Sequence, residues 1–258
     1  MVKVDKRLMR AAGRAIADYG MIQDHDRVLL GISGGKDSLS LLHILLQLQR
    51  SAPVNFELAA ITVDPMVEGF DPSSLQPYLE SLGVNYLYLQ EPILERAKQH
   101  MSGSSYCSWC ARMKRGVMYA AARSRGYNVL ALAQHLDDLA ESFLMSAFHG
   151  GRLSTMKAHY RVTEGDLRVI RPLVYAREWQ MRTFAERAQL PVIPDSCPAC
   201  FSMPTQRQHM KELLAEEEKV NPLLFKNILS TVHPLMAVNN ASGDEYSHVN
   251  KNCRDVEK

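Results

Sequence analysis

The stretch that decides the fold is Leu29-Leu30-Gly31-Ile32-Ser33-Gly34-Gly35-Lys36-Asp37-Ser38, in which an apolar run leads into a glycine-rich turn. Leucines at helical spacing follow, so the pattern predicts a strand over 28–32 and a helix over 38–49. Adjacent glycines let backbone N–H groups approach an anion without a Cβ in the way, and a helix N-terminus carries partial positive charge. Lys36 adds a full charge, and Ser33 and Ser38 add hydroxyl donors. The segment predicts a phosphate-binding loop, and the alternative is a structural turn between a strand and a helix.

The rest of the chain alternates short apolar runs with helical patterns. Further strands are expected over 58–63, 84–89, 129–133 and 169–173, and further helices over 73–82, 112–124, 137–147, 179–188, 206–219 and 223–235. This alternation predicts an α/β fold with a parallel sheet, helices on both faces and a helical C-terminal segment. We expect an N-terminal helix over 1–26, an α/β domain over 27–203 that carries the cysteines, C-terminal helices over 204–238 and a flexible tail over 239–258.

Composition excludes several classes of protein. The 258 residues are 46% hydrophobic and 22% charged, which is ordinary for a globular chain and excludes wholesale disorder. The net charge of +2 excludes a histone-like polycation but leaves room for local basic patches. No apolar run reaches the roughly 18 residues of a membrane span. The basic N-terminal stretch has no apolar signal region, so we expect a cytoplasmic protein with no membrane partner.

Polar side chains follow two other predicted strands. Asp64 ends the second strand, and His135, Asp137 and Asp138 come just after the fourth. Open α/β sheets bind ligands at the carboxyl ends of their strands, and carboxylates together with phosphates form the usual Mg²⁺ shell. These residues are therefore candidates for a nucleotide and magnesium site. The alternative is that they cap turns and helices.

Four of the five cysteines form two Cys-x-x-Cys pairs, Cys107 with Cys110 and Cys197 with Cys200. Four thiolates suit a closed tetrahedral zinc site, whereas three suit a [4Fe–4S] cluster with one open iron. A redox-active disulfide is the third alternative. The fifth, Cys253, lies in the polar tail and is expected to take no part.

The hexapeptide at 33–38 resembles the signature of the PP-loop ATP pyrophosphatases, which cleave ATP between the α and β phosphates and adenylate a carbonyl oxygen. The resemblance implies a PP-loop ATPase fold, of the adenine nucleotide alpha hydrolase type, with ATP and Mg²⁺ bound. It assigns catalytic roles to Lys36, Asp37 and Asp138. The ATP-binding residues that it implies are Ser33, Gly34, Gly35, Lys36, Asp37, Ser38, Asp64 and His135.

The order of the motifs also resembles the tRNA 2-thiocytidine synthetases over residues 7–219. In both, a Cys-x-x-Cys precedes a basic helix, and a second pair follows an Ile-Arg-Pro-Leu segment, here at 170–173. The resemblance implies that a tRNA cytidine, at anticodon-loop position 32, exchanges its C2 oxygen for sulfur. It implies a [4Fe–4S] cluster held by Cys107, Cys110 and Cys200, with Cys197 as the alternative third ligand. A sulfur donor such as a cysteine desulfurase, and a second copy of the chain, are the implied protein partners.

Two basic runs flank these motifs. They are the candidate RNA-binding residues, and they comprise Arg112, Lys114, Arg115, Arg152, Lys157 and Arg171. The alternative is that they are solvated helix faces. Two other functions fit the same motifs: a PP-loop enzyme that adenylates another base or a small molecule and has a zinc site, and a nucleotide-binding regulatory protein without turnover.

Overall fold

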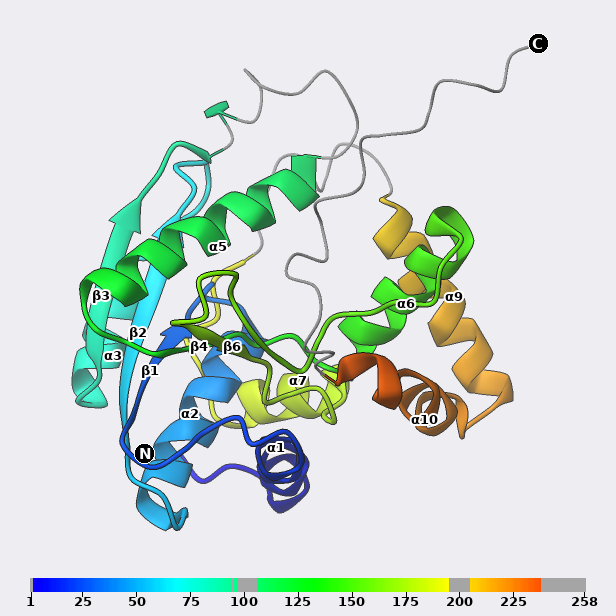
Figure 1. Ribbon diagram of the computed structural model, residues 1–258, viewed down its shortest axis with the longest axis horizontal. Coiled ribbons are helices and arrows are strands. Elements are labelled where there is room, and N and C mark those ends of the chain that lie inside the picture. Colours follow the sequence, from blue (N-terminus) through cyan, green and yellow to red (C-terminus); the bar gives the residue numbers. More distant parts are fainter. Residues whose placement is uncertain (1, 94, 97–105, 195–204, 238–258) are drawn as a thin grey trace.

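The structure of the chain is a computed structural model that describes residues 2–93, 95–96, 106–194 and 205–237 (Figure 1). Its centre is a six-stranded sheet in the order β3-β2-β1-β4-β6-β5. The strands are β1 (Asp26–Gly31), β2 (Phe56–Asp64), β3 (Asn85–Gln90), β4 (Val129–Ala131), β5 (His159–Arg161) and β6 (Arg168–Ile170). Within the described ranges, no helix combines the length and the apolar composition that a membrane span needs.

The predicted parallel sheet is confirmed for five strands, and the sixth is a correction. β5 pairs antiparallel with β6 at the sheet edge and was not predicted. Its sequence is His-Tyr-Arg, which lacks the apolar run that signals a buried strand. The strand predicted over 169–173 also ends early, because Pro172 follows it and has no N–H to donate to a ladder.

Alternation along the strands gives the sheet two cores. On β1, Val28 and Leu30 point into one hydrophobic cluster, while Leu29 points into the other. The same alternation on β4 places Val129 in the first cluster and Leu130 in the second. Successive side chains on a strand point to opposite faces, so a strand whose residues are all apolar is buried on both sides.

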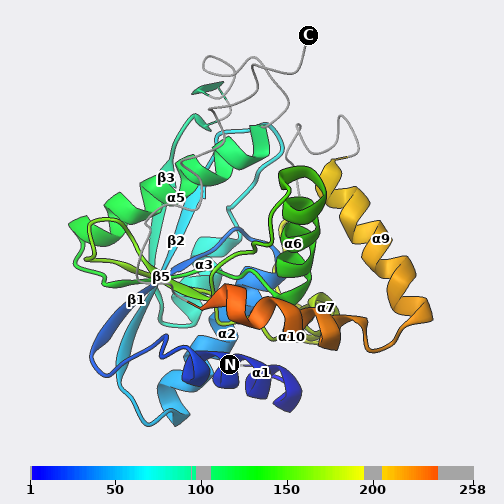
Figure 2. The ribbon, with the colours of Figure 1, turned by 45° about the vertical axis from the view of Figure 1, so that its right-hand side comes forward.

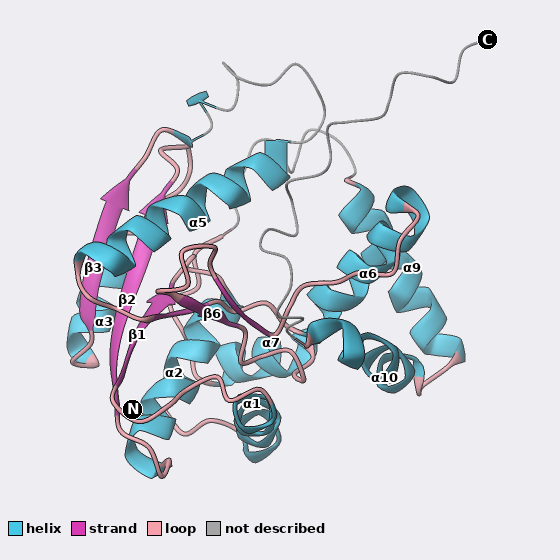
Figure 3. Cartoon of the chain, in the orientation of Figure 1, coloured by secondary structure: helices cyan, strands magenta, loops and turns pink. Residues whose placement is uncertain are grey.

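Helices cover both faces of the sheet, as predicted (Figures 1 and 3). One face packs against α1 (Lys6–Asp18), α2 (Lys36–Ser51), α3 (Leu75–Ser81), α7 (Glu178–Arg187) and α10 (Leu224–Met236). The other face packs against α5 (Tyr106–Ser124), which lies across the strands in Figure 1. A third cluster joins α6 (Leu136–Gly150) to α9 (Gln206–Val220) and α10, which lie beside it in Figure 2.

Two helices begin earlier than the sequence pattern indicated. α2 starts at Lys36 rather than Ser38, so Gly35 is the N-cap and Lys36 and Asp37 lie in the first turn. α5 starts at Tyr106 rather than Arg112, so it includes the first Cys-x-x-Cys pair. The leucines of α2 and the arginines of α5 indicated the body of each helix, and the predicted start was placed where those residues begin.

Candidate nucleotide and cysteine sites

The candidate nucleotide site lies where the chain order of the strands reverses. β1 and β4 are neighbours in the sheet, yet the helix after β1 leads away to β2 on the opposite side. The loop over 32–35 and the loop over 132–135 therefore leave the same edge of the sheet side by side. This crevice at the carboxyl ends of the strands is where open α/β sheets bind ligands.

Gly34 fixes the shape of the first loop. Its φ of +84° lies in the left-handed region, and a Cβ built there would come within 2.5 Å of Cδ1 of Ile193. The carbonyl of Gly34 accepts a hydrogen bond from the N–H of Ile193 at 2.9 Å. Gly35, by contrast, has φ −74°, and a Cβ at that position would lie 3.4 Å from Oγ of Ser33, an ordinary contact distance. The turn itself therefore demands glycine at position 34 only.

The two serines hold the loop closed. Oγ of Ser38 donates to the carbonyl of Gly35 at 2.9 Å and accepts from the backbone N–H of Ser33 at 3.2 Å. No side chain caps the N-terminus of α2 among the residues that the structure describes. Because the first N–H groups of a helix have no partner within the helix, this end of α2 presents donors suited to an anion such as a phosphate.

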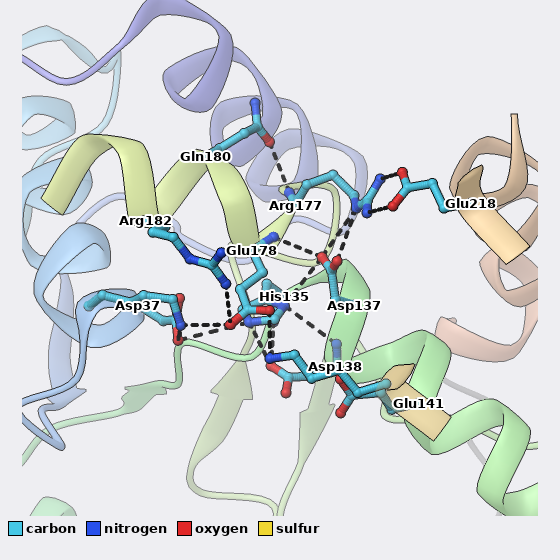
Figure 4. Close-up of polar contacts among 12 residues, drawn as sticks. Asp37, His135, Asp137, Asp138, Glu141, Arg177, Glu178, Gln180, Arg182 and Glu218 are labelled. Carbon is cyan, nitrogen blue, oxygen red and sulfur yellow. Dashed lines mark hydrogen bonds and ion pairs between the residues drawn. The ribbon is translucent and has the colours of Figure 1, made fainter. Parts of the chain in front are cut away.

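The second loop places His135, the N-cap of α6, among three aspartates. We refer to Asp37, His135, Asp137 and Asp138 as the acid cluster (Figure 4). Nε2 of His135 lies 3.8 Å from Oδ2 of Asp37 and 3.5 Å from Oδ2 of Asp138. Nδ1 accepts from the N–H of Asp138 at 3.4 Å in the neutral ring and lies 3.6 Å from Oδ2 of Asp137.

Charges in the acid cluster shift one another's titration. Burial alone would lower the pKa of His135, but the hydrogen bond with Asp137 and the charges of the other two aspartates outweigh it and raise the pKa. Burial raises the pKa of Asp37 despite its nearby cations. Oδ1 of Asp37 is buried without a hydrogen-bond partner among the described residues. Such an atom is costly unless a ligand satisfies it, so it marks a position suited to a cation or a donor group.

Lys36 is held by Glu178, the first residue of α7. Its Nζ lies 2.9 Å from Oε1 of Glu178 and 3.2 Å from Oδ2 of Asp37. The other carboxylate oxygen of Glu178 pairs with Lys211 of α9 at 2.8 Å. Burial alone would raise the pKa of Glu178, but the hydrogen bonds from Lys211 and Lys36 overcome it and lower the pKa to about 2.

Helix α9 makes three further ion pairs with the site. Arg207 lies 3.5 Å from Oδ1 of Asp138 and 3.2 Å from Oε2 of Glu141. Arg177 binds Asp137 at 3.1 Å and donates twice to Glu218 of α9, at 2.7 and 2.9 Å (Figure 4).

Sequence reasoning missed Glu178, Arg207 and Lys211 as site residues. All three lie far along the chain from the 33–38 loop, on helices whose own patterns are those of ordinary amphipathic elements. No local pattern joins them to the loop, because their contacts depend on how two distant helices dock.

Glu141 is the buried carboxyl behind the acid cluster. It is 4% exposed, and burial together with the charge of Asp138 raises its pKa to about 7. Nothing in the sequence selects this residue, because it has the pattern of an ordinary polar position in a helix.

Asp64 lies at the same sheet edge but one strand away. Its carboxylate accepts from the N–H of Met66 at 2.7 Å and from the hydroxyl of Tyr88. The structure thus brings Ser33, Lys36, His135 and Asp138 together, whereas Asp64 stands apart at the end of β2.

Cys107 and Cys110 lie one turn apart at the N-terminal end of α5. Cys110 is partly buried against the hydrophobic cluster on that face of the sheet. The first turn of a helix favours anionic groups, which suits a thiolate at position 107. Cys197, Cys200 and Cys253 lie outside the described residues, as does the tail over 239–258.

The predicted RNA-binding residues have different surroundings. Arg112 and Arg152 are exposed, and Lys114 and Arg115 are partly exposed on α5. Nζ of Lys157 donates to the carbonyl of Leu235 at 2.9 Å. Arg171 is 5% exposed and donates to Oε1 of Gln134 at 2.9 Å and to the carbonyl of Lys157, so its guanidinium supports the loop after β4 from inside the protein.

Comparison with known proteins gives a consistent set of relatives. A model of the PP-loop domain family matches residues 4–217. The tRNA-cytidine(32) 2-sulfurtransferase of Geobacter sulfurreducens is 44% identical over 225 residues, which cover 87% of this chain and 88% of that protein. The protein of the same name from Pelobacter propionicus is 42% identical, with 89% and 87% covered. Among solved structures, the U34-tRNA thiolase NcsA from Methanococcus maripaludis, with its [4Fe-4S] cluster, has a TM-score of 0.73. It is 22% identical and is matched over 91% of this chain and 79% of its own, which shows a shared fold.

Proposed function

The chain belongs to the PP-loop family and, within it, to the tRNA-cytidine(32) 2-sulfurtransferases, and we propose that it is an ATP-dependent tRNA thiolating enzyme. In this reaction the C2 oxygen of a tRNA cytidine, at position 32 of the anticodon loop, is adenylated and then replaced by sulfur. The observation that carries the proposal is the convergence of the 33–38 loop and the acid cluster at the β1/β4 crevice. That convergence supplies phosphate donors and carboxylates at one point.

The adenylation step makes a poor leaving group into a good one. The C2 oxygen attacks the α-phosphorus, the bond from that phosphorus to the bridging oxygen of pyrophosphate breaks, and pyrophosphate leaves. Attack of sulfur at C2 then releases the former C2 oxygen within AMP. The N–H groups at the start of α2, Lys36 and the hydroxyls of Ser33 and Ser38 would stabilise the charge that develops on the phosphates.

Magnesium fits the residues at the acid cluster. Asp37 offers a buried oxygen without a partner in the described part of the chain, and Asp138 lies across His135 from it. The described residues hold no group of three or more His, Cys, Asp or Glu arranged to bind a metal by themselves. Mg²⁺ is commonly bound by one or two carboxylates together with substrate phosphates, so Asp37 and Asp138 would hold it jointly with ATP. Asp64 and His135 complete the proposed ATP-binding set, with His135 orienting both aspartates.

The cysteine pair on α5 fits a thiolate-bound group. We propose Cys107, Cys110 and Cys200 as ligands of a [4Fe–4S] cluster, with Cys197 as the alternative third ligand. Three thiolates leave one iron of such a cluster open to bind a sulfur ligand, which is the chemistry that the group supplies when bound. A sulfur donor such as a cysteine desulfurase, a second copy of the chain and a cytoplasmic location belong to the same proposal.

The tRNA would approach the site across the basic side chains of α5 and the loop after α6. We propose Arg112, Lys114, Arg115, Arg152 and Lys157 as contacts to its phosphates. We propose that Arg171 supports the site and does not contact RNA, because its guanidinium holds Gln134 next to the acid cluster.

Nucleoside mass spectrometry of tRNA from a deletion strain tests the proposal. We expect 2-thiocytidine to disappear and to return with the wild-type gene, but not with Lys36→Ala or Cys107→Ala. Anaerobically purified protein should be brown and hold about four irons per chain. Unchanged thionucleosides in the deletion strain would refute the proposed function, and colourless protein with stoichiometric zinc would refute the cluster.

A further inference from the structure

A groove of about 540 Å³ lies between α1 and α10, apart from the nucleotide site. We refer to it as the cationic groove. Its rim carries Arg7, Arg10 and Arg14 from α1 and Lys226 from α10, and its lining also includes Tyr175 and His233. The described residues that line it include no aspartate or glutamate.

The amphipathic character of α1 places the arginines on this rim. Leu8, Ala12 and Ala15 are fully buried against the sheet, and the arginines at positions 7, 10 and 14 fall on the remaining face at intervals of three and four residues. At a rise of about 1.5 Å per residue, the row is roughly 10 Å long. A nucleic-acid strand carries one charge per about 3.4 Å of helix axis, so the row faces more than one phosphate.

The rim cations have few partners within the chain. Arg14 pairs with Asp18 at 3.4 Å, and its guanidinium lies 5.5 Å from the centre of the Tyr175 ring. The side chains of Arg7, Arg10 and Lys226 make no ion pair or hydrogen bond with any residue that the structure describes. Like charges held together without counter-charges repel one another, so an external polyanion would relieve the repulsion along this row.

Two aromatic rings, those of Tyr175 and His233, also line the cationic groove. The rings of Tyr175 and His233 are stacked, with centroids 6.4 Å apart and planes 18° from parallel. The hydroxyl of Tyr175 is fixed by a hydrogen bond to Asp18 at 3.1 Å. Aromatic faces bordered by cations are the surface on which sugars and bases of RNA pack while their phosphates are neutralised.

We propose that the cationic groove is a second RNA contact, which binds the phosphodiester backbone of the tRNA substrate away from the reacting base. This inference rests on the proposed function, because it takes its occupant from that reaction. RNA is favoured over a free nucleotide because the rim is a row of cations along a helix rather than a convergent cradle. It is favoured over an acidic protein because the proposed reaction already brings a polyanionic tRNA to this chain.

Equilibrium binding of tRNA to the full-length protein, measured over a range of salt concentrations, tests the proposal. Arg10→Glu should weaken tRNA binding at least about fivefold and reduce the slope of log K against log salt by about one. The matched control is Arg50→Glu, which makes the same charge change at an exposed helical position of α2 outside the groove. The control should retain wild-type affinity and slope, and both variants should bind ATP as wild type does.

Chemical protection supplies a second readout that needs no variant. Acetylation of Lys226 by a lysine reagent, followed by peptide mass spectrometry, should slow when tRNA is added but not when ATP is added. Lys219, an exposed lysine outside the groove, is the control and should react at the same rate throughout. Equal tRNA affinity for Arg10→Glu and Arg50→Glu, or unprotected Lys226, would overturn the groove proposal while thiolation persists. Thionucleosides that remain unchanged in the deletion strain would instead refute the proposed function.

Discussion

The nucleotide site and the cationic groove both concentrate charge, but they differ in how their charges are partnered. Asp137 meets Arg177 at 3.1 Å, and Lys36 meets Glu178 at 2.9 Å. In the groove, Arg14 has Asp18 as a neighbour at 3.4 Å, while Arg7, Arg10 and Lys226 have no acid partner within the described ranges. These charges of the nucleotide site are paired within the chain, whereas three of the four groove cations have no acid partner among the described residues.

This difference separates two uses of charge in one fold. Paired groups in a partly buried site hold each other in fixed positions, as catalysis of phosphoryl transfer requires. Unpaired cations on a helix surface do not fix geometry, but they attract a polyanion over a distance set by the salt concentration. The two regions should therefore respond to different perturbations, the acid cluster to pH and to isosteric changes and the groove to salt and to charge reversal.

Removing the loop lysine should give the largest effect and should separate the two regions. We expect Lys36→Ala to lower the rate of pyrophosphate release by at least roughly 100-fold, because a charge aimed at the transferring phosphates is lost. Its affinity for tRNA should stay within about twofold of wild type, because the groove is unaltered. Pyrophosphate release and filter binding measure the two quantities. The proposed separation of the two regions is wrong if Lys36→Ala lowers the rate of pyrophosphate release and the affinity for tRNA by the same factor.

Alanine substitutions of Gly34 and Gly35 should show that only position 34, where φ is positive, requires glycine. Gly34→Ala places a Cβ at a φ of +84° and within 2.5 Å of Ile193, which should cost about 2–4 kcal/mol of folding stability. Gly35→Ala, the matched control at φ −74°, should cost less than about 1 kcal/mol. Urea unfolding measures both, and equal losses would contradict the assignment of strain to position 34.

Glu178→Gln should show how the ion pairs of the nucleotide site make the stability of the fold depend on pH. The pKa of Glu178 is lowered to about 2, so the carboxylate stabilises the fold above its ordinary pKa and loses that effect as the pH falls toward 2. The variant should be about 2 kcal/mol less stable than wild type at pH 7, and the difference should shrink between about pH 4.5 and 2. Glu186→Gln, at an exposed position of the same helix, is the control. A pH-independent difference would mean that Glu178 acts through packing instead.

The sequence predicted the parts of this site that are local in the chain. The apolar run before Ser33, and the run before His135, identified two strand ends, and the rules for parallel sheets brought them together. The helix starts at Lys36 and Tyr106 were missed because the leucine and arginine patterns that indicated the two helices begin later in the chain. Glu178 was missed for a different reason. Its role depends on how α7 docks against α2 and α9, and no periodicity along a single chain encodes that contact.

The smallest effect is expected at Glu141, whose buried carboxyl lowers the stability of the fold when it is ionised. Burial raises the pKa of Glu141 to about 7, so its folded form holds a proton more tightly than the unfolded chain does. Glu141 should therefore make wild-type stability rise as the pH falls from 8 toward 4.5, and Glu141→Gln should weaken that dependence, with the part due to His135 retained. At pH 8 the variant should be more stable by about 1–2 kcal/mol, with the difference lost as the pH falls below the ordinary pKa of the carboxyl, about 4.5. Urea unfolding without nucleotide or Mg²⁺ measures this, with Glu217→Gln of α9, an exposed carboxyl, as the control. If Glu141→Gln were destabilising at pH 8, its pairing with Arg207 would outweigh burial. A stabilised variant would mean that the carboxyl is kept beside Asp138 for a reason other than folding.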